Sequence, residues 1–193
     1  LDVDGTLLGS AGNLRPRTIA SVRQAAEAGM QPVICTGRRY RRARPIADRL
    51  GLNVPIVCNS GALVKEPATH ATLWRADLPR ELVARLLELL ERLDEPTVSF
   101  TDRPPDQADF LVTRDPMGRP LFDDYLSQNQ GHADVDPAWT SRVMDESHYH
   151  ICAIGDRARM LEVENEIHQA FPQIVRTFVQ RSPRYAGTMC EVL

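Results

Sequence analysis

Two aspartates at the start of the chain are spaced for chemistry on a phosphate group. The chain opens LDVDGT, so that Asp2 and Asp4 flank a single valine and run into a turn at Gly5. One carboxylate can attack phosphorus, while the second can protonate the leaving oxygen and later deprotonate water. Two neighbouring carboxylates facing a phosphate need a hard cation to offset their repulsion, and Mg²⁺ with oxygen ligands fits. On this motif alone, a solvated turn remains the alternative.

Two other interpretations of the opening motif fail on the sequence. A calcium loop needs glycine and a final glutamate at the positions held by Leu7 and Asn13. Aspartic proteases pair two distant Asp-Thr-Gly turns, and the sequence contains only one related turn.

A second polar cluster follows an apolar run. The stretch VICTGRR places Thr36, Gly37 and Arg38 after a predicted buried strand and before a predicted helix. A hydroxyl, backbone N–H groups and a helix N-terminus together form a natural phosphate cradle. An ordinary strand-to-helix turn, which also favours threonine and glycine, is the alternative.

The elements around these clusters predict a parallel sheet. Apolar strands are expected at 1–3, 32–37 and 55–61, separated by one helix ended by Gly29 and another ended by Gly51. Alternating strands and helices are typical of a doubly wound α/β core. Ligands bind such sheets at the carboxyl ends of the strands. Three polar segments fall at those ends: 2–6, 36–38 and 59–61.

The pattern of expected helices and strands changes after residue 65. Amphipathic helices are expected at 80–93 and 160–171, with a short helical piece at 121–126. Strands are expected at 97–100, 108–113, 149–155, 174–180 and 188–193. We therefore expect an α+β module on an antiparallel sheet at 66–187, inserted after the third core strand, with 188–193 returning toward the core. His148 and His150 share one strand face, expected to be half-exposed, and Lys65 is expected to be an exposed linker residue.

Composition limits the partners. The 193 residues have a net charge of -3, which gives no electrostatic case for nucleic acid. Apolar runs are all shorter than the roughly 20 residues of a membrane span. The four cysteines show no metal-ligand spacing, so we expect reduced thiols and a cytoplasmic protein.

Together, DVDGTLL, ICTGR and CNSGALV resemble the haloacid dehalogenase-like (HAD) hydrolase superfamily. The resemblance is to the Cof-type phosphatase branch with a C2-type cap. It implies a Rossmann-like core, a Mg²⁺-dependent phosphatase acting on small phosphorylated metabolites such as sugar phosphates, and an aspartyl-phosphate intermediate. The implied catalytic residues are Asp2 as nucleophile and Asp4 as acid and base, both also metal ligands. The implied phosphate-binding residues are Gly5, Thr6, Thr36, Gly37 and Arg38.

Two features qualify the resemblance. The branch usually has Asn-Gly-Ala where Ser60, Gly61 and Ala62 stand, so Asn59 or Ser60 contacts substrate or simply forms a structural turn. The family also needs a lysine and a Gly-Asp-x-x-x-Asp segment after the cap, and Lys65, the only lysine, precedes it. We therefore expect the rest of the core to lie beyond residue 193. The alternative function is a catalytically inactive binding or regulatory module, or an inactive fragment.

Overall fold

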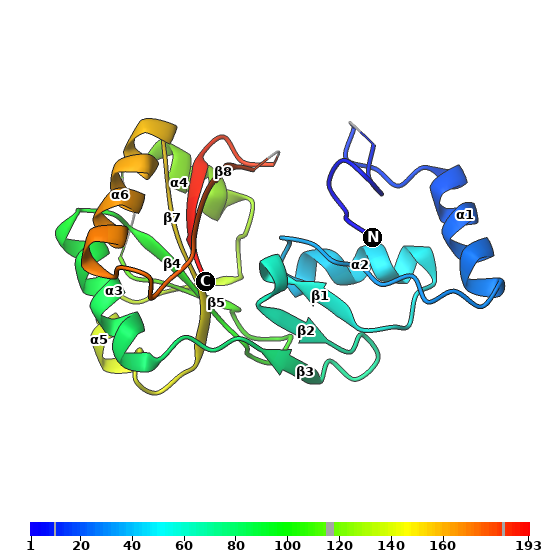
Figure 1. Ribbon diagram of the computed structural model, residues 1–193, viewed down its shortest axis with the longest axis horizontal. Helices are drawn as coiled ribbons and strands as arrows, with labels where there is room; N and C mark the ends of the chain where they lie inside the picture. The colour runs from blue at the N-terminus through cyan, green and yellow to red at the C-terminus, as the bar shows by residue number, and fades with distance from the viewer. Residues whose placement is uncertain (10, 115–117, 183) are drawn as a thin grey trace. The chain divides into compact units, whose positions relative to one another are not determined.

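The computed structural model describes residues 1–9, 11–114, 118–182 and 184–193. The chain forms two compact units, Leu1–Ala76 and Asp77–Leu193 (Figure 1). The sequence placed the boundary after residue 65, whereas the structure places it after residue 76. The difference arises because residues 66–76 include a strand that pairs with the first unit.

The first unit combines helices with short strands. Its described elements are α1 (Pro16–Glu27), α2 (Tyr40–Leu50), β1 (Ile56–Cys58), the 3₁₀ turn η1 (Asn59–Gly61), β2 (Leu63–Lys65) and β3 (Thr72–Arg75). Pro16 occupies the first turn of α1, where a missing N–H costs nothing. Gly51 ends α2 in the left-handed conformation, with φ 75°. Both predicted helices are therefore confirmed.

Parallel pairing links the first, second and third apolar runs. Cys35 N donates to Leu1 O at 2.9 Å, Thr36 N to Val57 O at 3.0 Å, and Val57 N to Ile34 O at 2.9 Å. These bonds follow the parallel pattern and confirm the predicted α/β core. The ladder is short, because Pro32 and Pro55 lack the N–H that would extend it at its start. The run 32–37 consequently forms a single bridge, Cys35 to Val57, and no strand of its own.

The antiparallel hairpin in this unit was not predicted. β1 pairs with β2 and β2 with β3, both antiparallel, in the order β1-β2-β3. The sequence signal is weak because each strand spans only three or four residues.

The second unit is an α+β layer structure. Its described elements are α3 (Arg80–Arg92), β4 (Thr97–Thr101), β5 (Phe110–Val112), α4 (Pro120–Ser127), β6 (Ala133–Val135), α5 (Trp139–Arg142), β7 (His148–Gly155), α6 (Arg157–Ala170), β8 (Thr177–Arg181) and β9 (Thr188–Val192). The strands form one sheet in the order β6-β5-β4-β7-β9-β8. All neighbours pair antiparallel except β5 and β6, which are parallel.

Helices cover both faces of this sheet. Ile151 and Ala153 point from β7 into the main apolar cluster, which includes buried residues of α3 and α6. On the other face, the rings of Phe110 and Tyr125 lie 5.8 Å apart and join β5 to α4. The alternation follows from the two-residue period of a strand. β9 lies between β7 and β8, so residues 188–192 complete this sheet, where the sequence had suggested a return toward the core.

Three side chains expected to be exposed are buried. Lys65 is 6% exposed, and its Nζ lies 5.5 Å from the centre of the Tyr40 ring. His148 and His150 are 1% and 3% exposed. The register shift of β4 against β7 between Phe100 and Thr101 ends the alternation there, so His148 contacts Ser99 while the His150 ring lies 4.8 Å from the Phe100 ring. The Ser99 hydroxyl lies 2.7 Å from Nδ1 of His148.

The four cysteines, which all lie among the described residues, are not joined in disulfides; Cys58, Cys152 and Cys190 are buried and Cys35 is exposed. Burial raises the pKa of the Cys190 thiol to about 12. Among the described residues, every helix is too short or too polar to cross a bilayer.

Candidate functional site

The three polar segments that the sequence singled out meet at one edge of the first unit. The parallel pairing of Leu1, Cys35 and Val57 brings the three apolar runs side by side in the same direction. Each run is followed directly by one polar segment, so the segments share the carboxyl edge. The predicted convergence is therefore present in the backbone, before any side chain is considered.

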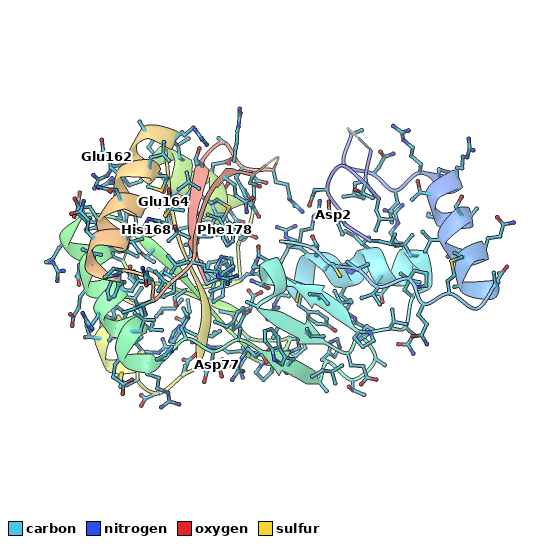
Figure 2. The ribbon with its side chains drawn as sticks, in the orientation of Figure 1. Asp2, Asp77, Glu162, Glu164, His168 and Phe178 are labelled. Carbon is cyan, nitrogen blue, oxygen red and sulfur yellow. The ribbon has the colours of Figure 1, made fainter. Side chains whose placement is uncertain are left out.

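The first segment is a tight loop. Val3 O accepts hydrogen bonds from Leu7 N at 3.1 Å and from Leu8 N at 3.0 Å, which folds the chain back after the run. Gly5 has φ 81°, a conformation that glycine adopts without strain. Asp2 is exposed at the start of this loop (Figure 2). The carboxylate is therefore accessible to a ligand.

Asp4 is held by an arginine from the second segment. Arg38 donates from Nε to one carboxylate oxygen at 2.7 Å and from Nη2 to the other at 2.6 Å. The exposed fractions of the two side chains are 13% for Arg38 and 31% for Asp4. Two parallel N–H···O bonds of this kind fix orientation as well as charge. The sequence predicted both residues in the site, but not their contact.

Thr36 and Gly37 shape the second segment. Thr36 is 6% exposed, and its hydroxyl accepts a hydrogen bond from Arg38 N at 3.2 Å. A Cβ placed on Gly37 would lie 3.4 Å from the Ser60 hydroxyl, so a side chain here would crowd the third segment. α2 begins at Tyr40, which places a helix N-terminus next to this turn. Such a terminus favours anions.

The third segment is a strained turn tied to the second. Asn59, Ser60 and Gly61 all have positive φ, at 49°, 55° and 95°. Asn59 N donates to Arg38 O at 2.9 Å, and Ser60 N donates to Thr36 O at 3.3 Å. Consecutive left-handed residues outside glycine are costly and concentrate at functional sites.

The Asn59 side chain is the most unusual group of the site. It is 1% exposed, yet neither atom of its amide has a hydrogen-bond partner among the described residues. Leaving a buried amide unpaired costs about 1–3 kcal/mol. The sequence suggested either a substrate contact or a structural turn at this position. The strained backbone agrees with a structural turn. The unpaired amide could still hydrogen-bond a ligand, so both alternatives stand.

The structure thus joins most of the expected residues through direct contacts. The residues joined by hydrogen bonds or close approach are Asp4, Thr36, Gly37, Arg38, Asn59 and Ser60. Asp2, Gly5 and Thr6 lie on the same loop as Asp4 and are exposed. Their assigned roles remain predictions.

The side chains of the site limit which metal ion it could hold. Among the described residues there is no group of three or more histidine, cysteine, aspartate or glutamate side chains that could hold a metal ion. Zinc sites need such a group. Mg²⁺ usually takes only one or two carboxylates and completes its shell with water and substrate phosphate. Because Arg38 binds both carboxylate oxygens of Asp4, the donors that fit Mg²⁺ are the exposed Asp2 carboxylate and the backbone carbonyl of Asp4.

Comparison of the chain with known proteins identifies its family. Residues 1–189 match the sequence model of haloacid dehalogenase-like hydrolases. The chain is 35% identical to the pyridoxal phosphate phosphatase YbhA of Escherichia coli over 95 residues, which are 49% of this chain and 34% of that protein. It is 32% identical to the HMP-PP phosphatase of Serratia proteamaculans over 101 residues, 52% of this chain and 36% of that protein.

A solved structure shares the fold along the whole chain. A haloacid dehalogenase-like hydrolase from Bacteroides thetaiotaomicron superposes with a TM-score of 0.78 at 17% identity, covering 100% of this chain and 68% of that one. The matches to the two curated phosphatases span about a third of their length. Since the family match covers nearly all of the chain, the resemblance drawn from its motifs is confirmed: this chain belongs to the haloacid dehalogenase-like hydrolases.

Proposed function

We propose that the protein is a phosphatase that hydrolyses small phosphorylated metabolites through an aspartyl-phosphate on Asp2. Two similar proteins are named as phosphatases of pyridoxal phosphate and of HMP-PP, which supports a small phosphorylated substrate. The contact of Arg38 with Asp4, beside the exposed Asp2, is the observation that carries the proposal. The Asp2 carboxylate is exposed, and the contact orients the Asp4 carboxylate two residues away, which supports these two roles.

In the first half of the reaction, a carboxylate oxygen of Asp2 attacks phosphorus and the ester P–O bond breaks. Asp4 donates a proton to the oxygen that leaves. In the second half, Asp4 takes a proton from water, whose oxygen attacks phosphorus and releases Asp2 and inorganic phosphate. General acid–base catalysis of this kind contributes roughly 10² to 10⁴ in rate.

Arg38 has two roles in this scheme. It fixes the direction of the Asp4 carboxylate, and its guanidinium, which has five N–H donors, also donates to a phosphate oxygen. The phosphate is further bound by the Thr36 hydroxyl and by the backbone of Gly5, Thr6 and Gly37. Asn59 or Ser60 contacts the bound substrate. A contact made by Asn59 would give its buried amide a hydrogen-bond partner.

Mg²⁺ is the proposed cofactor. Asp2 and the backbone carbonyl of Asp4 would hold it, and it would neutralise charge between the carboxylates and the phosphate. The substrate is the only partner proposed, without nucleic acid or membrane. Buried thiols at three of four cysteines support a reducing, cytoplasmic location.

A pair of substitutions tests the proposal. Asp2→Asn removes the nucleophile while keeping the shape of the side chain, so hydrolysis of an aryl phosphate by the natural protein should fall to background. Asp48→Asn is the matched control, because Asp48 is an exposed aspartate on α2 whose contact with Arg44 is 3.9 Å long. Phosphate binding without turnover in the unmodified protein would instead support the non-catalytic module.

A further inference from the structure

The strand β8 forms one edge of the six-stranded sheet and pairs with β9 alone among the described strands. Arg176 N donates to Leu193 O at 3.1 Å and Leu193 N donates to Arg176 O at 3.0 Å, so this pair exchanges both of its backbone hydrogen bonds. Such pairs recur at every second residue of an antiparallel ladder. The backbone N–H and C=O groups of Thr177, Val179 and Arg181 therefore point away from β9.

This edge has few of the features that keep further strands from adding to a sheet. Proteins protect open edges with very short strands, prolines, lysines or β-bulges. Within the described strand, five residues with the sequence TFVQR contain neither proline nor lysine, and the only charged side chain, Arg181, stands at the end. The register of β8 with β9 is regular along all five residues. The outward groups thus form a template for one more strand.

Phe178 adds an exposed apolar side chain to this edge. It is 48% exposed, and Figure 2 labels it on β8. Gln180 shares its face of the sheet, because residues two apart in a strand point to the same side, and Gln180 is exposed as well. Val179 points to the opposite face and packs against the main apolar cluster. A strand added beside β8 would remove part of the Phe178 ring from water.

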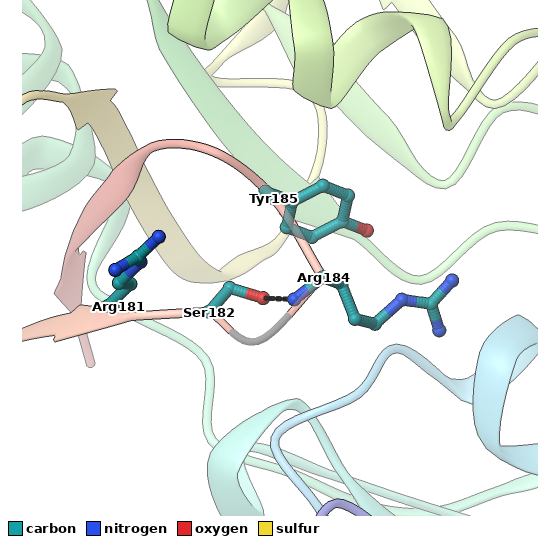
Figure 3. A pocket seen from close by; sticks show the side chains of 4 residues that line it. All are labelled: Arg181, Ser182, Arg184 and Tyr185. Atoms are coloured by element: carbon teal, nitrogen blue, oxygen red, sulfur yellow. Dashed lines mark hydrogen bonds between the residues drawn. The ribbon is translucent and has the colours of Figure 1, made fainter. Parts of the chain in front are cut away.

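The two ends of β8 carry groups of opposite charge. At the start, the Thr177 hydroxyl donates to the Glu164 carboxylate at 2.8 Å and lies 2.7 Å from Nε2 of His168, both on α6 (Figure 2). At the other end stands Arg181, whose side chain points to the opposite side of the following turn from that of Arg184 (Figure 3). Four residues of extended strand separate Thr177 from Arg181 by about 13 Å. In one chain, the acidic and the basic group therefore mark opposite ends of the edge.

Beyond the substrate, we propose a second partner: another copy of this chain, whose β8 pairs antiparallel with β8 across a two-fold axis. Such an axis places the same surface on both sides of the contact. All three outward residues find partners only when the axis passes Val179, so that Thr177 faces Arg181 of the second copy. About six backbone hydrogen bonds then join the two strands. The proposal rests on this edge and does not depend on the hydrolysis proposed above.

This register brings opposite charges together at both ends of the contact. Directly opposed residues of this kind have Cα atoms about 5.5 Å apart and side chains on the same face. Because Glu164 accepts a hydrogen bond from Thr177, Arg181 of the second copy comes next to Glu164. Symmetry repeats the contact at the other end. On the opposite face, Phe178 is the diagonal neighbour of Phe178 in the second copy, which lies within reach of an aromatic side chain.

The predicted contact is small, so it predicts a weak dimer. Two five-residue strands with an ion pair at each end bury less surface than a standard protein interface. We expect a dissociation constant on the order of 10 to 100 µM. Because the ion pairs are exposed, association should weaken as salt rises.

The direct test is sedimentation equilibrium of the natural protein, from about tenfold below to about tenfold above this dissociation constant. A monomer–dimer equilibrium is expected. Val179→Pro removes the central outward N–H and keeps the ladder to β9, because an edge strand tolerates proline where its N–H faces solvent. The dissociation constant should then rise at least about tenfold, with the melting temperature measured alongside. A natural protein that stays monomeric overturns the proposal, whether another chain or water covers the edge.

Exchanging the charges distinguishes this pairing from misfolding and from contacts elsewhere. Arg181→Glu and Glu164→Arg each place like charges at both ends, so either variant alone should associate about tenfold more weakly. Mixed in equal amounts, the two variants restore both pairs of opposite charge and should form a heterodimer about as tight as the natural dimer. Arg92→Glu, on an exposed arginine of α3, is the control for net charge and should change the dissociation constant less than about twofold.

The mixture gives the result that a merely destabilised variant cannot imitate. Variants that fail to associate alone but do so together show that Glu164 and Arg181 meet between copies. A mixture that associates no better than either variant would refute the register. Dimers that persist unchanged in Val179→Pro and Arg181→Glu would place the contact on another surface and overturn the proposal.

Discussion

Removing Arg38 is the perturbation whose size follows most directly from the structure. Arg38→Ala deletes two charge-assisted hydrogen bonds to Asp4, at 2.6 and 2.7 Å. Breaking a fully buried pair costs about 3–5 kcal/mol and an exposed pair about 0–1. Because Asp4 is 31% exposed and Arg38 13%, water compensates part of the loss. We expect a loss of about 2 kcal/mol in the stability of the unit Leu1–Ala76.

Amide hydrogen exchange measures this loss of stability within the parallel pairing next to Arg38. The amides of Cys35 and Val57 are bonded within the parallel pairing, so they exchange when this part of the unit opens. A loss of about 2 kcal/mol corresponds to exchange roughly thirtyfold faster at these amides. Arg38→Lys keeps the charge but loses the two-point geometry, so we expect about half the effect in free energy.

An exposed ion pair on α2 supplies the control variant for this measurement. Arg44→Ala removes an exposed contact in which Nε of Arg44 lies 3.9 Å from the Asp48 carboxylate. Such pairs contribute about 0.5 kcal/mol or less, so exchange should change less than about threefold. An Arg38→Ala protein that exchanges no faster than Arg44→Ala would refute the view that Arg38 holds Asp4.

Three further predictions concern catalysis, pH and backbone strain. Asp4→Asn should lower turnover of an aryl phosphate by about 10² to 10⁴, and a loss below about threefold would remove Asp4 from acid–base work. Burial lowers the pKa of His148 to about 4 and of His150 to about 3, so the unfolded chain takes up protons first as the pH falls below about 6.5. The free energy of unfolding should therefore fall by about 4 kcal/mol between neutral pH and about pH 5, and His150→Phe should remove about half of that dependence. A free energy of unfolding, measured with urea, that does not change with pH would contradict this. Gly61→Ala should cost about 1–2 kcal/mol at φ 95°, because alanine is strained there, and an unchanged urea midpoint would show that the turn relaxes.

The sequence predicted the long elements of the fold well because their patterns are strong. Helix α3 was expected at 80–93 and lies at Arg80–Arg92, and β7 was expected at 149–155 and lies at His148–Gly155. The short strand β6 escaped prediction: it spans three residues and pairs parallel to β5 at the sheet edge, which no local pattern indicates. Burial of His148 and His150 was also missed, because it depends on β4, whose Ser99 and Phe100 contact the two rings and whose alignment with β7 no local pattern indicates.

The candidate site was predictable in its residues but not in its contacts. Asp4, Thr36 and Arg38 stand next to apolar runs, and a parallel arrangement places the ends of such runs together. The bidentate pair of Asp4 and Arg38 depends on side-chain directions that spacing does not encode. The unpaired amide of Asn59 likewise appears only when the strained turn is seen in three dimensions.

The central claim is that Asp2 carries the phosphoryl group during turnover. The most direct measurement mixes the natural protein with an aryl phosphate and Mg²⁺, quenches during turnover, and reduces any acyl phosphate with borohydride before mass spectrometry of the peptides. Reduction of an aspartyl-phosphate converts that aspartate to homoserine. We predict homoserine at position 2 and an intact aspartate at position 4. Steady turnover with both aspartates unmodified, or with the change at another residue, would contradict the account.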